Sequence, residues 1–294
     1  MSRKVVDSAL LARLAHLSVR AGQVVEGTLT GQHRSPHQGA SVEFAQHREY
    51  APGDEIKHID WNAYARSDRY QVKQFEDETN LRAFLLLDTS GSMDYGRNGL
   101  PTKLEYAARL TAALAWVLLR QGDAVGLLTF GDKLGTYVPP RSRPDHFWNL
   151  VRVLEKEPVG GPTDVVRAME HIAEVSGRRA VVFLVSDCFD FSGRVAAIAR
   201  QLRRRRHRVV VFQVLDPDEV DFPFSEVTLF EELESDQREL ADPRGMRDAY
   251  LEEMRAFCEG LRRELLEGGV AYYRVDTREP LDRTVFEFFQ SGGR

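Results

Sequence analysis

The chain has 294 residues, 43% of them hydrophobic and 29% charged, which is typical of a globular protein and long enough for about two domains. Its 45 acidic and 40 basic residues give a formal net charge of −5, which disfavours a general nucleic-acid-binding protein, because such proteins are usually basic. The two cysteines, Cys188 and Cys258, have no paired spacing, which excludes a disulfide framework and a cysteine-rich zinc site.

The first 80 residues predict a helix followed by a β-rich subdomain. Apolar residues at helical spacing indicate a helix from Ser8 to about Val19, and alternating side chains from Tyr70 to Glu76 indicate a half-buried strand. The segment Ser41–Asn80 stays open to two interpretations: a structural unit whose charges pair locally, or a recognition surface. The chain starts without an apolar signal region and has no run of about 18 apolar residues, so we expect a cytoplasmic protein without membrane insertion.

A predicted strand at Phe84–Leu87 is followed directly by a cluster of oxygen-bearing side chains. Four apolar residues in succession predict a strand that is buried on both faces. The cluster consists of Asp88, Ser90 and Ser92. It stands where open α/β sheets bind their ligands, at the carboxyl end of a strand, and its oxygens suit Mg²⁺. The sequence therefore favours a metal site here over an ordinary serine-rich turn.

From Arg82 onward, strand patterns alternate with helix patterns, as in an α/β protein with a doubly wound, mostly parallel sheet and helices on both faces. The sequence predicts helices at 103–121, 145–155, 165–175, 192–206, 243–267 and 281–290, and further strands at 125–130, 136–138, 180–185, 209–215, 227–230 and 270–275. We expect strand 136–138 to lie at an edge and stop at Pro139–Pro140, and Phe147 and Trp148 to join the core. The expected domains are 1–80 and 81–294, the second with an acidic insertion around 217–242.

The Asp-x-Ser-x-Ser pattern of residues 88–92 resembles the metal-ion-dependent adhesion site (MIDAS) of von Willebrand factor A (VWA) domains. The resemblance implies two further metal-site residues, Thr163 and Asp187, with Asp190 a less suitable alternative to Asp187. VWA domains usually have Gly-Gly-Thr where this chain has Gly-Gly-Pro-Thr, so Pro162 makes the geometry of that loop less certain. Right-handed crossovers would bring the three loops to one rim of the sheet.

The resemblance also implies the chemistry of the site. Mg²⁺, or Mn²⁺, would contact the two serine hydroxyls and sometimes the threonine directly, while the two aspartates would bind through water or alternate with direct contact. An ion with mostly neutral ligands keeps its charge and an open position, which an acidic residue of a partner protein can fill. The implied metal site consists of Asp88, Ser90, Ser92, Thr163 and Asp187.

A second resemblance covers most of the chain, and it is carried by short motifs placed directly before the metal pattern. They are Glu43-Phe44, Arg48-Glu49-Tyr50, Pro52-Gly53-Asp54, Ile59-Asp60-Trp61, Ala65-Arg66 and Val72-Lys73-Gln74-Phe75. Their order is similar to that of the bacterial VWA-containing family catalogued as domain of unknown function 58 (DUF58). This resemblance implies a non-enzymatic adaptor that acts with a MoxR-type AAA+ ATPase in the assembly or maturation of other proteins. The ATPase must be a separate chain, because this sequence has no phosphate-binding loop of the Walker type.

Two other functions are weighed against this one. A metal-assisted hydrolase or phosphatase with Asp88 or Ser90 as nucleophile is the alternative, but Ser90 lacks a Gly-x-Ser-x-Gly elbow and no histidine lies near the three loops in sequence. Nucleic-acid binding through Arg203–Arg206 is disfavoured by the net charge, and a basic last turn also complements the dipole of its helix. We therefore expect no enzyme activity and no nucleic-acid partner.

Overall fold

The computed structural model describes residues 5–6, 11–12, 42–49, 71–77, 81–97, 99–177, 179–189, 193–231, 233 and 238–290. The chain divides into two compact units, one formed by Gln32–Asn80 and the other by Met1–Gly31 together with Leu81–Arg294. Of the helix expected from Ser8 to Val19, Leu11 and Ala12 are described, and both are helical. Its remaining residues lie outside the described ranges.

The smaller unit contains an antiparallel strand pair, β1 (Val42–Glu49) and β2 (Gln71–Asp77). The register runs from Val42 opposite Asp77 to Glu49 opposite Gln71, with one extra residue on β1 between Phe44 and Gln46, which is a β-bulge. The strand predicted at 70–76 is confirmed by β2, which begins and ends one residue later. The rest of the segment Ser41–Asn80 lies outside the described residues, so both interpretations of it stay predictions.

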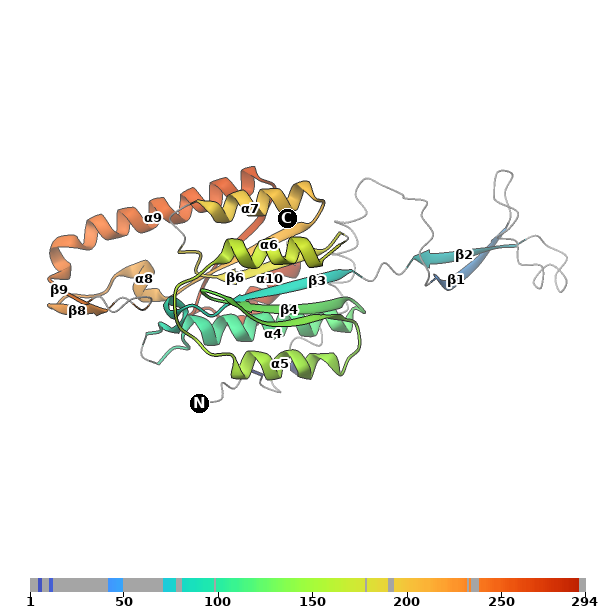
Figure 1. The fold of residues 1–294 in the computed structure, drawn as a ribbon, viewed down its shortest axis with the longest axis horizontal. Helices are drawn as coiled ribbons and strands as arrows, with labels where there is room; N and C mark the ends of the chain where they lie inside the picture. The colour runs from blue at the N-terminus through green and yellow to red at the C-terminus, as the bar shows by residue number, and fades with distance from the viewer. Residues whose placement is uncertain are drawn as a thin grey trace. The chain divides into compact units, whose positions relative to one another are not determined.

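The larger unit is built on a six-stranded sheet with the order β10-β7-β6-β3-β4-β5 (Figure 1). Every neighbouring pair is parallel except β4 and β5. The strands are β3 (Arg82–Asp88), β4 (Ala124–Phe130), β5 (Leu134–Arg141), β6 (Val181–Ser186), β7 (Arg208–Leu215) and β10 (Ala271–Asp276). The prediction of a mostly parallel, doubly wound α/β fold is confirmed.

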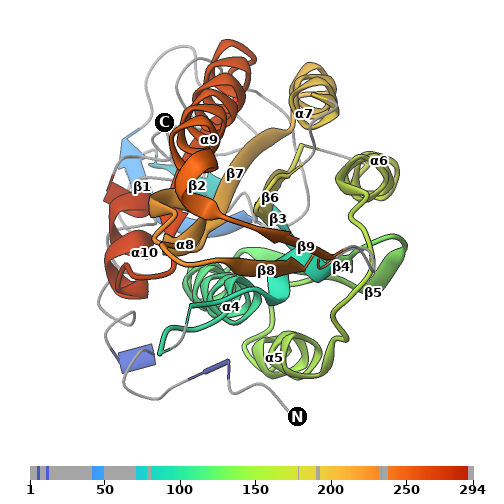
Figure 2. The same cartoon turned by 90° about the vertical axis from the view of Figure 1, so that its left-hand side faces the viewer.

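Helices cover both faces of this sheet, which explains why its central strand is a continuous apolar run. Leu85 and Leu87 of β3 pack with α4, α5 and α10, whereas Phe84 and Leu86 pack with α6, α7 and α9 on the other face (Figure 2). The helices are α4 (Lys103–Arg120), α5 (His146–Lys156), α6 (Val165–Val175), α7 (Arg194–Arg204), α9 (Pro243–Glu267) and α10 (Leu281–Gln290). Within the described ranges, no helix is long and apolar enough to cross a membrane.

The edge strand β5 differs from the prediction. It continues through Pro139 and Pro140 to Arg141, so the expectation that the prolines stop the strand was wrong. An edge strand tolerates the missing N–H groups, and the prolines lie in a bulge between two paired positions. Gly126 of the neighbouring strand leaves them room, since a β-carbon there would lie 3.1 Å from the Pro140 nitrogen.

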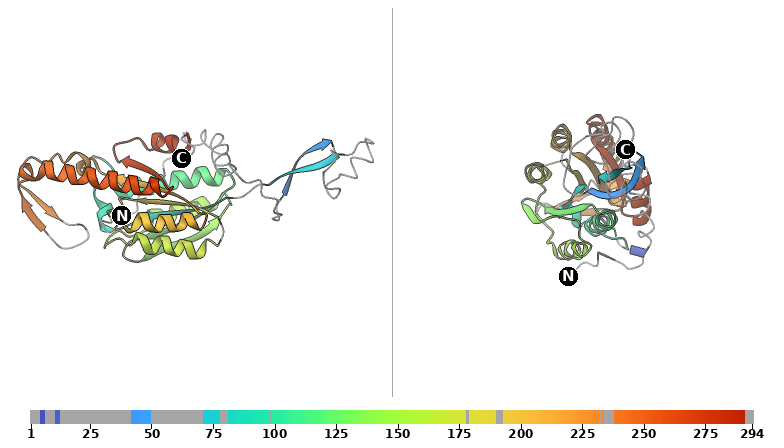
Figure 3. Two further views of the ribbon diagram at one scale, coloured as in Figure 1. Left: turned by 90° about the horizontal axis from the view of Figure 1, so that it is seen from above. Right: turned by 90° about the vertical axis from the view of Figure 1, so that its right-hand side faces the viewer.

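The described residues of the acidic insertion around 217–242 contain more secondary structure than its composition suggested. It contains a short helix, α8 (Pro217–Asp221), and a two-stranded antiparallel ribbon, β8 (Thr228–Glu231) with β9 (Arg238–Ala241). The strand expected at 227–230 is confirmed, but α8 was not foreseen. The ribbon leads directly into α9 (Figure 3).

Candidate metal centre

The loop after β3 presents two hydroxyls over a buried carboxylate. Asp88, the last residue of β3, is fully buried, and its Oδ1 accepts a hydrogen bond of 2.9 Å from the Ser90 backbone N–H. The chain then enters a single 3₁₀ turn, η2 (Gly91–Asp94). This turn places the Ser90 and Ser92 hydroxyl oxygens 3.2 Å apart. The two serines of the Asp-x-Ser-x-Ser pattern therefore point to one place, as predicted.

The loop before α6 joins this cluster through its threonine. The Thr163 hydroxyl donates to Asp88 Oδ2 at 3.0 Å. The preceding Gly160 and Gly161 have φ angles of 139° and 74°, which favour glycine, and the Gly91 N–H donates to the Gly161 carbonyl at 2.8 Å. Pro162, the departure from the usual VWA pattern, thus leaves the threonine in contact with Asp88.

The loop after β6 supplies the second carboxylate. Asp187 is fully buried, its Oδ1 accepts from the Phe189 N–H at 3.2 Å and its Oδ2 accepts from Lys103 Nζ at 2.8 Å. The residue before it, Ser186, donates its hydroxyl to Asp88 Oδ2 at 2.6 Å. All three loops predicted from sequence therefore meet around Asp88. Asp190, the alternative carboxylate, lies outside the described residues.

The buried carboxylates make this place favourable for a cation. Burial, followed by the negative charge of Asp187, raises the pKa of Asp88 from 3.8 to about 6, although hydrogen bonds from Ser186 and Ser90 oppose the shift. A divalent ion close to Asp88 would stabilise the charged carboxylate and so oppose the rise in its pKa.

The geometry of the donors fits Mg²⁺. All candidate ligands are hard oxygens, and neighbouring ligands of an octahedral Mg²⁺ with bonds of about 2.1 Å lie about 3 Å apart, close to the 3.2 Å between Ser90 Oγ and Ser92 Oγ. In the part of the chain that the structure describes, no group of three or more His, Cys, Asp or Glu side chains could hold a metal. A metal at this site would therefore depend on the serine and threonine hydroxyls.

Lys103 is a component of the site that the sequence did not reveal. It is the first residue of α4, it is fully buried, and its Nζ lies 2.8 Å from Asp187 Oδ2 and 2.5 Å from Glu219 Oε1 of α8. Burial lowers the pKa of Lys103, but the charges of Asp187 and Glu219 more than offset it, so the ammonium stays charged. A lysine in the first turn, where the helix dipole disfavours a cation, was the available signal that carboxylates lie nearby.

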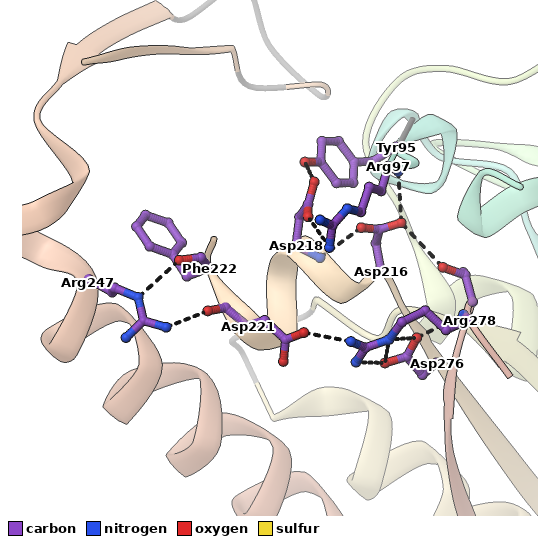
Figure 4. A network of polar contacts seen from close by, with 10 residues as sticks. Tyr95, Arg97, Asp216, Asp218, Asp221, Phe222, Arg247, Asp276 and Arg278 are labelled. Carbon is purple, nitrogen blue, oxygen red and sulfur yellow. Dashed lines mark hydrogen bonds and ion pairs between the residues drawn. The ribbon is translucent and has the colours of Figure 1, made fainter. Parts of the chain in front are cut away.

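Acidic residues at the start of α8 also hold the segment that follows η2 (Figure 4). The Tyr95 hydroxyl donates to Asp218 Oδ2 at 3.1 Å, and the Arg97 backbone N–H donates to Asp216 Oδ2 at 3.0 Å. Residues 88–97, referred to below as the metal-site loop, are therefore connected to α8 twice, through these contacts and through Lys103.

The other end of α8 is attached to α9 and to the residues after β10, as Figure 4 also shows. The Arg247 guanidinium of α9 donates to the carbonyls of Asp221 at 3.0 Å and Phe222 at 3.2 Å. Arg278 pairs with the Asp221 carboxylate at 2.7 Å and with Asp276 at 2.6 Å. Because α8 is fixed at both ends, Glu219 is held in place beside Lys103.

The β8–β9 ribbon lies over the metal-site loop. A β-carbon added at Gly91 would lie 2.1 Å from the carbonyl oxygen of Leu233, a residue between the two strands of the ribbon. In Figure 2 the two strands cross in front of the ends of β3 and β4. The ribbon therefore belongs to the surface around the site.

The sequence is similar to a known protein family and to individual bacterial proteins. Residues 46–257 match the family described as "Protein of unknown function DUF58". Rv1480 of Mycobacterium tuberculosis H37Rv is 29% identical over 222 residues, which cover 74% of this chain and 68% of that protein. YeaD of Bacillus subtilis is 26% identical over 176 residues, covering 51% and 42% of the two chains.

Similar solved structures include BatB from Bacteroides thetaiotaomicron, with 18% identity, a TM-score of 0.47 and coverage of 72% of this chain and 98% of that one. The SpRpn10 VWA domain has 15% identity, a TM-score of 0.36 and coverage of 46% and 76%. The family match spans most of the α/β unit together with residues 46–80, which make up most of the smaller unit. The chain belongs to the DUF58 family.

Proposed function

We propose that this protein is a non-enzymatic, Mg²⁺-dependent protein-binding module, whose ion captures an acidic residue of a partner protein. The observation that carries the proposal is the convergence of three loops on one buried carboxylate. Five oxygen-bearing residues come together there: Asp88, Ser90, Ser92, Thr163 and Asp187. Hydroxyl ligands would leave most of the charge of the ion free to attract a carboxylate from outside.

The surroundings of Ser90 support binding rather than catalysis. Its hydroxyl interacts with that of Ser92, which is not a base, and with the carboxylate of Asp88, which the proposal assigns to the ion. Among the described residues, the buried histidines are His146 and His207, and they hydrogen-bond to the Val125 carbonyl and to Ser176. Both lie at the amino ends of the parallel strands, whereas the site lies at the carboxyl ends. Neither histidine can therefore activate Ser90 as a nucleophile.

The surface around the site supports a protein as the ligand. Leu229 and Leu240 are cross-strand neighbours on the β8–β9 ribbon, and they are 50% and 68% exposed. Leu233, whose carbonyl lies against Gly91, is 45% exposed. Exposed apolar side chains grouped beside a polar site are typical of protein-interaction surfaces.

The partner that we propose is a MoxR-type AAA+ ATPase, with this protein acting in the cytoplasm as its adaptor in the assembly or maturation of other proteins. This part rests on the resemblance of the sequence to VWA-containing proteins of the DUF58 type. The metal, with Mn²⁺ as a substitute for Mg²⁺, would make the interaction switchable.

The test is a binding measurement between this protein and a purified MoxR-type ATPase, with Mg²⁺ and with a chelator. We expect binding with Mg²⁺ that is lost with the chelator and in Asp88→Ala and Ser90→Ala. Ser142→Ala is the matched control, because Ser142 is exposed and follows the end of β5 that pairs with the amino end of β4, away from the site. Binding that is unchanged by the chelator and by both variants would overturn the proposal.

A further inference from the structure

A buried ammonium group stands beside the carboxylate that a metal at this site would require. Lys103 is fully buried, and its Nζ lies between Asp187 of the loop after β6 and Glu219 of α8, at 2.8 Å and 2.5 Å. The aromatic ring of Phe189 closes the space around it, with its centroid 4.8 Å from the ammonium. Such a charge is close enough to influence any ion bound near Asp187.

Both oxygens of Asp187 are occupied by donors from the protein. Oδ2 accepts from Lys103, and Oδ1 accepts from the Phe189 N–H at 3.2 Å. An ion that bound this carboxylate directly would lie close to the ammonium and be repelled by its charge. Asp88 differs, because the donors that it accepts from, the Ser90 N–H and the Thr163 and Ser186 hydroxyls, are all neutral and do not repel an ion.

The position of Lys103 is fixed from both sides. A capping box formed by Thr102 and Glu105 sets the start of α4, and the Lys103 N–H donates to the Tyr95 carbonyl at 2.8 Å. Glu219 is fixed as well, because its Oε2 accepts from the Asp216 N–H at 2.8 Å while its Oε1 faces Lys103. The ammonium is therefore a permanent part of the site rather than a mobile surface charge.

We propose that Lys103 is a positioning residue that holds Asp187 out of the inner coordination sphere and weakens the binding of a divalent ion. The inner ligands then come from Ser90, Ser92, Thr163 and Asp88, water fills the other positions of the octahedron, and the acidic residue of a partner can replace a water. The inference rests on the proposed metal binding. It adds that this chain keeps its ion weakly by itself and holds it firmly only when the partner carboxylate completes the coordination.

The experiment is calorimetric titration of the full chain with Mg²⁺ and with Mn²⁺. In Lys103→Met the repulsion is lost and Asp187 is free, so we expect binding to tighten by about tenfold or more, the size typical of changes around metal ligands. Lys103→Arg keeps the positive charge and should bind as weakly as the wild type. Damage to the structure would weaken binding, so tightening is a result that a merely structural role cannot give.

A second variant protects the test against misfolding. Lys103→Met leaves the buried Asp187 and the partly buried Glu219 without a counter-ion, whereas the double variant Lys103→Met/Glu219→Gln removes one charge of each sign and still frees Asp187. Tighter binding in either variant supports the proposal. If the wild type binds Mg²⁺ and neither variant binds it more tightly, the role of Lys103 is overturned while metal binding stands. If no chain binds either ion, both proposals fail.

Discussion

The carbonyl oxygen of Leu233 lies so close to Gly91 that a β-carbon at position 91 would stand 2.1 Å from it. Both partners in this contact are backbone, so no side-chain rotation can relieve it. Glycine is thus required between the two serines of the metal-site loop by the ribbon that lies over it.

Gly91→Ala should therefore separate the β8–β9 ribbon from the metal-site loop. We expect a loss of about 1–3 kcal/mol in the free energy of unfolding, the usual range for overpacking, together with faster proteolytic cleavage within the ribbon. Chemical denaturation and limited proteolysis measure the two effects. An unchanged cleavage rate would show that the contact does not hold the ribbon.

Gly260→Ala is the matched substitution without a clash. Gly260 lies inside α9, and a β-carbon there meets no atom within 4 Å. Because alanine has a higher helix propensity than glycine, we expect a gain of about 0.5–1 kcal/mol in the free energy of unfolding. A loss of stability in denaturation would contradict the open surroundings of this residue.

Asp88→Asn should stabilise the metal-free protein at neutral pH. Burial and the charge of Asp187 raise the pKa of Asp88 from 3.8 to about 6, so the folded state holds a proton that the unfolded state releases between these values. Stability is therefore lost as the pH rises from about 4 to 6. Removing the carboxylate should raise the free energy of unfolding by up to about 3 kcal/mol at pH 8 and by almost nothing at pH 4.

The check is urea denaturation of both chains in the presence of a chelator at several pH values. A stability difference that does not change with pH would contradict the prediction. Added Mg²⁺ should raise the stability of the wild type more at pH 8 than at pH 5, and should have little effect on Asp88→Asn.

His207 should make the protein sensitive to acid. Burial, and then the positive charge of Arg205, lower the pKa of this histidine, so the folded state favours the neutral ring. Below a pH of about 6.5 the unfolded state takes up a proton that the folded state resists, so stability falls as the pH falls. The check is denaturation of His207→Gln and of the wild type from pH 7.5 to 5. As the pH falls, the free energy of unfolding of the wild type should decrease more than that of the variant.

Phe147 and Trp148, adjacent residues of α5, should respond very differently to truncation. Phe147 is 1% exposed and packs edge-on against Trp116, whereas Trp148 is 53% exposed. Phe147→Ala should lower the free energy of unfolding by about 3–5 kcal/mol, and Trp148→Ala should lower it by less than about 1 kcal/mol. Equal losses in denaturation would show that Trp148 is a core residue.

The local sequence was enough to predict the sheet and the meeting of three loops around Asp88. The apolar run before Asp88 and the run before Asp187 indicated strands covered on both faces, and the carboxyl ends of parallel strands place their loops at one rim. The same reasoning placed both aromatics of α5 in the core. Helical spacing alone did not show that the apolar face ends between Phe147 and Trp148.

The polar partners of the site could not be predicted in this way, because they are distant in sequence. Lys103 is separated from Glu219 by 116 positions in the sequence and from Asp187 by 84, and neither pairing leaves a local pattern. The start of helix α8 does have a local sequence pattern, because Asp216 and Glu219 form a capping box with Pro217 between them. The acidic composition of the insertion hid this signal.

The prolines of β5 have a consequence for how copies of this protein can associate. An exposed edge strand invites pairing with another chain, and lysines, bulges or prolines are what discourage it. Pro139 and Pro140 offer no N–H group at two successive positions, and they stand at a bulge. A second copy cannot continue the hydrogen-bond ladder past them, so this side of the sheet is protected against edge-to-edge aggregation.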